Sequence, residues 1–218
     1  MPDSAVTVVL PCLNEEASLP GVLAGIPAGY RALVVDNNST DATAQVARRH
    51  GAHVVIETRP GYGSAVHAGM VAATTPIVAV LDADGSLDPA DLPLMVAELD
   101  RGADLVTGRR RPVRGLRWPW HARLGTAAVS WRLRTRYGLP VHDIAPMRVT
   151  LREPLLRLGV QDRRSGYPVE LLMRAAAAGW RVVERDVGYG PRTGGKSKVS
   201  GSVRGSVIAA VDFWRAIS

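Results

Sequence analysis

Residues Pro76 to Ser86, with the sequence PIVAVLDADGS, join an apolar run to two carboxylates. A run rich in β-branched residues is typical of a buried parallel strand, and its abrupt end marks where the strand leaves a sheet. Asp82 and Asp84 are two residues apart, so in an extended chain they would share one face. Ligands of open α/β sheets bind just beyond such strand ends. Paired carboxylates there suit Mg²⁺ or Mn²⁺ carrying a diphosphate, although a strand-end turn with Gly85 would use the same residue types.

Outward from this stretch, strand-like and helical segments alternate through the first half of the chain. This alternation predicts an α/β fold with a mainly parallel central sheet flanked by helices. We expect a first strand that Pro11 stops and a second helix capped by Ser39 or Thr40 and ended by Gly51. The expected strands are residues 5–10, 32–35, 53–56, 76–81, 105–107 and 181–183.

The second half of the chain changes in character after Gly108. We expect a helix over about 121–137, a helix that ends near Gly179, and a final amphipathic helix over about 203–214. The length of 218 residues fits a single domain, and we expect one half up to residue 110 and another over 111–218. No basic leader with an apolar core is present at the start, and no run reaches the ~18 apolar residues of a membrane span.

Charge is divided unevenly between the two halves. Residues 1–100 hold 4 basic and 12 acidic residues, a net of −8, whereas residues 101–218 hold 23 basic and 8 acidic residues, a net of +15. An acidic half suited to a metal is therefore joined to a basic half suited to anions. The anion could belong to a phosphorylated ligand, a membrane surface or a nucleic acid.

Acidic residues recur where the expected strands end. Glu15 follows the first strand, Asp36 the second, and Asp82 and Asp84 the fourth. Because the carboxyl ends of parallel strands line one edge of a sheet, these acids should converge there. Turn formation or helix capping could also explain Glu15 and Asp36.

Four segments together resemble the successive signatures of family 2 glycosyltransferases, which have the GT-A fold. The resemblance implies an inverting enzyme that uses a nucleoside diphosphate sugar and a divalent metal, Mg²⁺ or Mn²⁺. The four segments are VLPCLNEE (9–16), VVDNNSTD (34–41), GYGSA (61–65) and LDADG (81–85).

Within this family the chain is most similar to the dolichyl-phosphate mannose synthase-like branch. The supporting segments are 108–109, 143–148, 169–172 and 192–198. The chain departs from the branch at Ile144 to Met147, where a Ser-Gly-Phe segment is usual, at Gly85-Ser86, and in lacking transmembrane segments. The first departure concerns the geometry of the acceptor site.

The resemblance also implies roles for individual residues. Asp84 would hold the metal against the diphosphate, Asp82 would contact the nucleotide sugar and assist at the metal, and residues 1–110 would form the nucleotide-sugar half. Residues 111–218, with the terminal amphipathic helix, would form the acceptor half. The nucleotide-sugar-binding residues would be Pro11, Leu13, Glu15, Asp36, Asn38, Gly61, Asp82 and Asp84.

Basic residues supply the remaining candidates. The chain has only two lysines, Lys196 and Lys198, and both lie in the glycine-rich segment GGKSK. Such a loop could close on a phosphate, or it could be an exposed loop with two chance lysines. Residues 109–136 hold nine arginines and three tryptophans, a composition that suits an anionic membrane interface, stacking on single-stranded nucleic acid, or a solvated helix face.

The predicted reaction is transfer of a sugar, with inversion, to a polyprenyl phosphate or another anionic lipid-linked acceptor. Arg109, Lys196 and Lys198 would offset phosphate charge. A hydroxyl acceptor, such as a polysaccharide or a small molecule, would need a general base, for which Asp143 is the candidate. A non-catalytic nucleotide-binding module would keep the same fold, and a nucleic-acid binder would use the basic half, although we expect no nucleic acid. We expect a cytoplasmic protein with peripheral contact at the inner face of the membrane.

Overall fold

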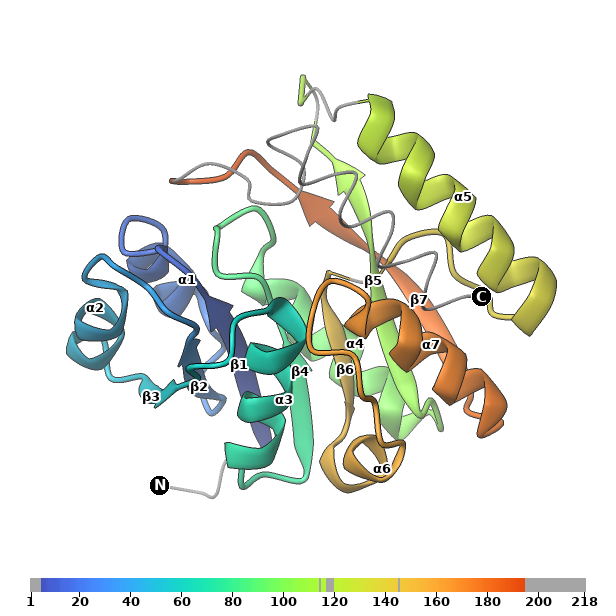
Figure 1. Ribbon diagram of the computed structural model, residues 1–218, viewed down its shortest axis with the longest axis horizontal. Helices are drawn as coiled ribbons and strands as arrows, with labels where there is room; N and C mark the ends of the chain where they lie inside the picture. Colours follow the sequence, from blue (N-terminus) through green and yellow to red (C-terminus); the bar gives the residue numbers. More distant parts are fainter. Residues whose placement is uncertain (1–4, 114, 117–119, 145, 195–218) are drawn as a thin grey trace.

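The computed structural model describes residues 5–113, 115–116, 120–144 and 146–194 (Figure 1). The predicted amphipathic helix over 203–214 lies outside the described residues, as do Lys196 and Lys198. The helices are α1 (Leu19–Gly25), α2 (Thr43–Arg49), α3 (Tyr62–Ala72), α4 (Leu92–Asp100), α5 (Trp120–Tyr137), α6 (Arg152–Arg157) and α7 (Tyr167–Ala177), with a 3₁₀ turn at Pro89–Asp91.

Seven strands form a single sheet with the order β3-β2-β1-β4-β6-β5-β7. Only β6 runs against its neighbours β4 and β5, and the other pairings are parallel. The predicted single α/β domain with a mainly parallel sheet is therefore confirmed. The strands are β1 (Val6–Cys12), β2 (Arg31–Asp36), β3 (His53–Ile56), β4 (Ile77–Val80), β5 (Leu105–Pro112), β6 (Arg148–Leu151) and β7 (Val182–Tyr189).

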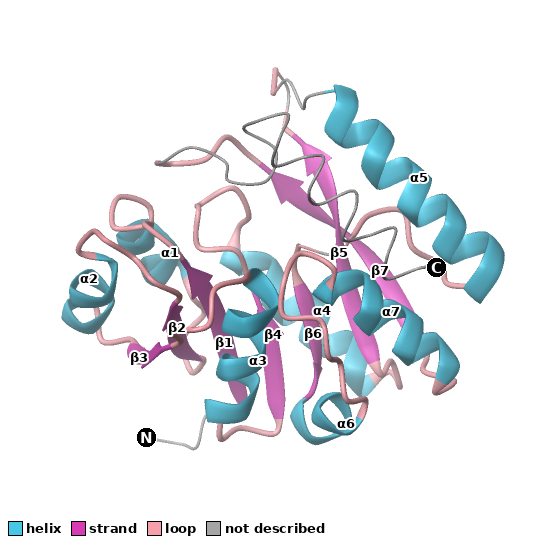
Figure 2. Cartoon of the chain, in the orientation of Figure 1, coloured by secondary structure: helices cyan, strands magenta, loops and turns pink. Residues whose placement is uncertain are grey.

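Helices cover both faces of the sheet and give it two separate cores (Figure 2). Val9 and Val35 contribute to the core that α3, α5, α6 and α7 cover. Val8 and Val34 contribute to the core beneath α1, α2 and α4. Because successive strand residues point to opposite faces, a continuous apolar strand fills both cores at once.

Two expectations at the ends of β1 and β2 are wrong in detail. Pro11 does not stop the first strand, since β1 continues to Cys12. The carbonyl of Val9 accepts a hydrogen bond from Leu81, just after β4, and the carbonyl of Cys12 accepts one from Asn37, just after β2. Pro11 is two residues after Val9, so its nitrogen also faces the β4 side. Because β4 ends at Val80, the missing N–H of Pro11 costs no hydrogen bond between strands. Neither Ser39 nor Thr40 caps α2, because the N-cap residue of this helix is Ala42. The Ser39 hydroxyl instead accepts a hydrogen bond from the Asn14 N–H.

The strand β6 and the helix α6 are features that the sequence pattern does not reveal. The four residues of β6 lie between β4 and β5, with Val80 opposite Arg148 and Thr107 opposite the same residue. The β5 and β7 strands are also longer than expected, and β5 extends past residue 110. The insertion of β6 widens the sheet and brings the basic second half of the chain next to β4.

Helix α5 packs one side against the protein and leaves the other side bare. Val129 and Leu133 are buried, whereas Leu124 and Trp131 on the opposite stripe are 61% and 60% exposed. Figure 1 shows α5 at the outer margin of the fold, beyond β7. Within the part of the chain that the structure describes, no helix combines the length and apolar character that a membrane span requires.

Candidate active site

The segment after β4 delivers two carboxylates to the carboxyl edge of the sheet. The backbone of Leu81 still pairs with Val9, and the chain then bends at Gly85, whose φ of 75° is the left-handed region that favours glycine. Asp84 is buried, at 4% exposure, and its Oδ1 accepts a hydrogen bond from the Ser86 N–H at 2.8 Å. Asp82 is only partly buried. The predicted position of the pair at a strand end is thus observed.

Three arginines from distant parts of the chain act on Asp82. Burial and the neighbouring charge of Asp84 raise the pKa of Asp82 to about 6, while Arg148, Arg110 and Arg192 oppose this rise. The three arginines come from β6, from β5 and from the segment after β7. Cations near an acidic pair favour its ionised form, and they also attract an anionic ligand to the same edge of the sheet.

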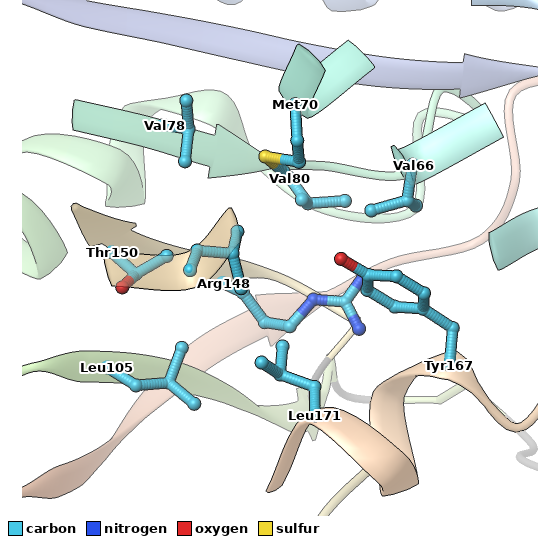
Figure 3. A pocket seen from close by; sticks show the side chains of 10 residues that line it. Val66, Met70, Val78, Val80, Leu105, Arg148, Thr150, Tyr167 and Leu171 are labelled. Atoms are coloured by element: carbon cyan, nitrogen blue, oxygen red, sulfur yellow. The ribbon is translucent and has the colours of Figure 1, made fainter. Parts of the chain in front are cut away.

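Arg148 lines a mostly apolar pocket together with residues such as Val80, Leu105 and Leu171 (Figure 3). It is 2% exposed, lies 5.6 Å from the centre of the Tyr62 ring and 5.9 Å from that of Tyr167, and donates from Nη2 to the Tyr62 hydroxyl at 2.6 Å. Its Nε and Nη1 have no hydrogen-bond partner among the described residues. Burying a guanidinium without an anion in contact is costly, which suggests that its charge is retained for function.

Arg110 is fixed by Asp143, the residue predicted to be a general base. The guanidinium donates from Nε to Oδ2 at 2.8 Å and from Nη2 to Oδ1 at 2.7 Å, and the Arg110 backbone donates to Oδ2 at 3.0 Å. The Ile144 N–H also donates to Oδ1 at 2.7 Å. Both oxygens of Asp143 therefore already accept strong hydrogen bonds, an arrangement that favours a positioning role over proton abstraction.

The loops after β1 and β2 are joined into one rim. The Asn14 N–H donates to Ser39 Oγ at 3.0 Å, and the Glu15 N–H donates to Thr43 Oγ1 at 2.8 Å. Asp36 accepts the Ser39 N–H at 2.9 Å, while the Glu15 carboxylate accepts from the Ser18 hydroxyl at 3.0 Å. Glu15 and Asp36 thus lie on the expected edge and also shape their own loops. Pro11 and Leu13 line the same rim at the end of β1, and Leu13 is exposed.

Gly61, predicted to bind the nucleotide sugar, also allows close packing against the backbone of Arg163. A Cβ at Gly61 would lie 2.1 Å from the carbonyl oxygen of Arg163, so only glycine allows this approach. Its N–H donates to the Oδ1 of Asn37 at 2.9 Å, and the buried Asn37 also holds the Glu57 carbonyl at 2.8 Å. The predicted neighbour Asn38 is exposed and has a φ of 67°. The side chains of Asn37 and Asn38 therefore both tie the loop after β2 to the loop after β3.

The carboxylate pair fits a divalent ion that is bound together with a diphosphate. Among the described residues no group of three or more His, Cys, Asp or Glu side chains could hold a metal by itself. Mg²⁺ is commonly held by one or two carboxylates plus substrate phosphates, which is the number that Asp82 and Asp84 can offer. The residues present therefore fit a metal that arrives with its nucleotide.

Several functional candidates are not evident from the sequence. The motifs predict Arg109, whereas the neighbouring Arg110 is an arginine that lowers the pKa of Asp82. Arg148 and Arg192 stand out in the sequence only as members of longer segments. A buried charge inside a short strand is the signal that distinguishes Arg148, and that signal exists only once the fold is known.

A mainly parallel sheet that carries an acidic pair just after β4, at the edge where the loops after β1 and β2 also lie, is the arrangement of a glycosyltransferase of the GT-A fold. Residues 7–158 match the sequence model of glycosyl transferase family 2, and the chain belongs to this family.

Relatives and solved structures agree with this assignment. The chain is 79% identical, over 100% of both sequences, to an uncharacterised glycosyltransferase of Mycobacterium tuberculosis. It is 32% identical to the undecaprenyl-phosphate mannosyltransferase of Micrococcus luteus, over 96% of this chain and 93% of that protein. Its fold matches that of glucosyl-3-phosphoglycerate synthase of M. tuberculosis, solved with Mn²⁺, UDP and glucosyl-3-phosphoglycerate. The TM-score is 0.79 and the identity 22%, over 97% of this chain and 78% of that one.

Proposed function

We propose that the protein transfers a sugar, with inversion, from a nucleoside diphosphate sugar to a polyprenyl phosphate. The observation that carries this proposal is the carboxylate pair Asp82 and Asp84 surrounded by Arg110, Arg148 and Arg192. Carboxylates suit a metal-bound diphosphate, and arginines suit a second anionic group at the same edge.

At the donor, Asp84 and Asp82 would hold Mg²⁺ or Mn²⁺ against the diphosphate. The bound ion would offset the negative charge that develops on the leaving group. Pro11, Leu13, Glu15, Asp36, Asn38 and Gly61 would form the nucleotide side of the site, because they lie on the rim that the β1, β2 and β3 ends build. The solved glucosyl-3-phosphoglycerate synthase holds Mn²⁺ and UDP. Only the divalent ion and the diphosphate are proposed for this chain as well.

On the acceptor side, the hydrogen bonds that both oxygens of Asp143 already accept favour an acceptor group that is ionised before it binds. A phosphate monoester has a second pKa of about 6, so it is anionic near neutral pH and needs no base. A hydroxyl acceptor would require Asp143 to take a proton while Arg110 and Ile144 occupy its oxygens. Arg109, Lys196 and Lys198 would supply further charge to either phosphate, and the two lysines lie outside the described residues.

The bare face of α5 supports a lipid-borne acceptor. Leu124, Ala127, Ala128 and Trp131 follow the spacing of one helical stripe, and all four are exposed. By the same geometry Arg123 and Arg132 lie on its two sides. An apolar stripe flanked by arginines suits the surface of an anionic membrane. The proposal therefore includes peripheral binding of the protein to a membrane through this face of α5. Two relatives are named for polyprenyl-phosphate substrates, which points the same way.

The test is a transfer assay with UDP-, GDP- and dTDP-sugars, Mg²⁺ or Mn²⁺, and undecaprenyl phosphate. Undecaprenol without phosphate is the matched control acceptor. We expect lipid-linked sugar by mass spectrometry with the phosphate only, and an inverted anomeric configuration by NMR. Transfer to a soluble hydroxyl compound, with none to the lipid phosphate, would replace this proposal by a mechanism in which Asp143 acts as base.

A further inference from the structure

The carboxylate expected to hold the metal is already paired with a cation. Arg192 Nη2 lies 2.6 Å from Asp84 Oδ2, and the Asp84 side chain is only 6% exposed. The other oxygen, Oδ1, accepts the Ser86 N–H at 2.8 Å. Both oxygens of Asp84 are therefore engaged within the protein.

This ion pair is built into the fold by the backbone on either side of it. The Thr193 N–H donates to the carbonyl of Asp84 at 3.0 Å, and the Gly190 N–H donates to that of Ser86 at 2.8 Å. A bridge between Leu87 and Tyr189 continues the same pairing. The segment after β7 thus runs beside the segment after β4, and its register determines that Arg192 meets Asp84.

Gly85 is what permits this close approach. Its φ is 75°, a conformation that favours glycine, and a Cβ on it would lie 1.9 Å from Thr193 Oγ1, so any other residue would force Thr193 to move. The sequence Asp-Gly at 84–85 therefore has two uses: it supplies a carboxylate, and it admits the strand-like segment that neutralises that carboxylate.

Among the three arginines near the acidic pair, Arg192 is the one suited to change partners. Arg110 is fixed by Asp143, and Arg148 is enclosed by Tyr62 and Tyr167. The Arg192 side chain is 30% exposed and reaches Asp84 from the end of a strand. A guanidinium and a divalent cation on the same buried carboxylate repel each other strongly, because few water molecules separate them.

We propose that Arg192 is an exchangeable counter-ion of Asp84, which holds the carboxylate in the absence of donor and leaves it when a divalent ion binds. This inference rests on the metal site of the proposed function. A divalent ion alone must break the ion pair and leave Arg192 without an anion. A nucleoside diphosphate supplies that anion, so metal and nucleotide should bind cooperatively, and Arg192 should be a source of the coupling.

The experiment measures Mn²⁺ binding by the loss of the free-ion electron paramagnetic resonance signal, with and without UDP or GDP. Arg192→Met removes the counter-ion. Arg111→Met is the matched control, because Arg111 forms an exposed ion pair with Asp186 on the neighbouring part of the fold. Without nucleotide, we expect Arg192→Met to bind Mn²⁺ about fivefold or more tightly than the wild type, with a smaller further gain on adding nucleotide. We expect Arg111→Met to match the wild type.

Asp84→Asn separates failure of this inference from failure of the proposed metal site. If Asp84→Asn loses Mn²⁺ binding but Arg192→Met binds it no more tightly than the wild type, the counter-ion role is wrong and the metal site stands. If Asp84→Asn binds Mn²⁺ as the wild type does, or if no form binds it even with nucleotide, the metal site itself is wrong and the counter-ion role falls with it.

Discussion

Arg110 and Asp143, 33 residues apart, are joined by a bidentate ion pair and a third hydrogen bond from the Arg110 backbone. The side chains are 20% and 3% exposed, so the pair lies largely out of water. Removing one partner of such a pair leaves the other charge buried and unpaired. The pair therefore decides how a variant at Asp143 should be interpreted.

We expect Asp143→Ala to reduce the free energy of unfolding by about 3–5 kcal/mol, because it leaves Arg110 without its anion. In an Arg110→Met background the same change should cost much less. Chemical denaturation of the four proteins gives this double-mutant cycle. Equal costs in both backgrounds would mean that the pair contributes little, and would restore Asp143 as a candidate base.

Asp84→Asn preserves the shape of the side chain but removes its charge. We expect turnover to fall by roughly 10²-fold or more, because charge stabilisation at the leaving diphosphate is lost. The control is Asp100→Asn, at the exposed end of α4, which should leave turnover unchanged. The measurement is the initial rate of sugar transfer at saturating metal. Turnover of Asp84→Asn at the wild-type level would show that the acidic pair is not the donor site.

Arg148→Met should separate stability from activity. Removing a buried guanidinium with two unpartnered nitrogens should leave the melting temperature unchanged or raise it. Turnover should fall by about tenfold, since one fixed charge beside the acidic pair is lost.

Arg148→Met should also change the pH dependence of activity. Because Arg148 lowers the pKa of Asp82, its loss should raise that pKa further above about 6. Activity that needs the ionised carboxylate should then be lost at a higher pH than in the wild type. The acid limb of the pH profile of kcat/KM tests this, with the exposed Arg157→Met as control. An unshifted acid limb would contradict a role for Arg148 at Asp82.

The outer stripe of α5 should bind anionic vesicles. Replacing Leu124 and Trp131 by serine removes two exposed apolar side chains, so we expect binding to phosphatidylglycerol vesicles to weaken by about tenfold or more. Leu94→Ser is the matched control, because Leu94 is 58% exposed on α4, which covers the other face of the sheet. Sedimentation with vesicles at low and high salt separates the apolar contribution to binding from the electrostatic one. Equal weakening by the two changes would argue against a specific membrane face.

Glu170 gives a prediction for stability at low pH. Burial alone would raise its pKa, but hydrogen bonds from the backbone of Asp162 and Gln161 and the ion pair with Arg174 lower it below its usual value of 4.5. A lowered folded-state pKa stabilises the protein above the unfolded pKa, and this contribution is lost as pH falls through the folded one. Wild type should therefore be more stable than Glu170→Gln at pH 7, and the difference should shrink below about pH 4. A constant difference across this range would contradict the shift.

The sequence alone was enough to predict the parallel part of the sheet and the place of the acidic pair. Val8 and Val9, or Val34 and Val35, point to opposite cores, so an uninterrupted apolar run identifies a strand buried on both faces. The change from Leu81 to Asp82 then marks the strand end. These features are local, because they depend only on side-chain type and on the two-residue period of a strand.

The tertiary structure alone decided the partners of the charged residues. Arg148 meets Tyr62 across 86 positions of the chain, in a four-residue strand too short to be recognised from its pattern. Arg192 meets Asp84 because the segments after β4 and β7 run side by side, and Arg110 lowers the pKa of Asp82. Burial, ion pairing and the resulting pKa values depend on which distant segments pack together. For that reason the sequence located the acidic pair, and the fold selected the arginines that surround it.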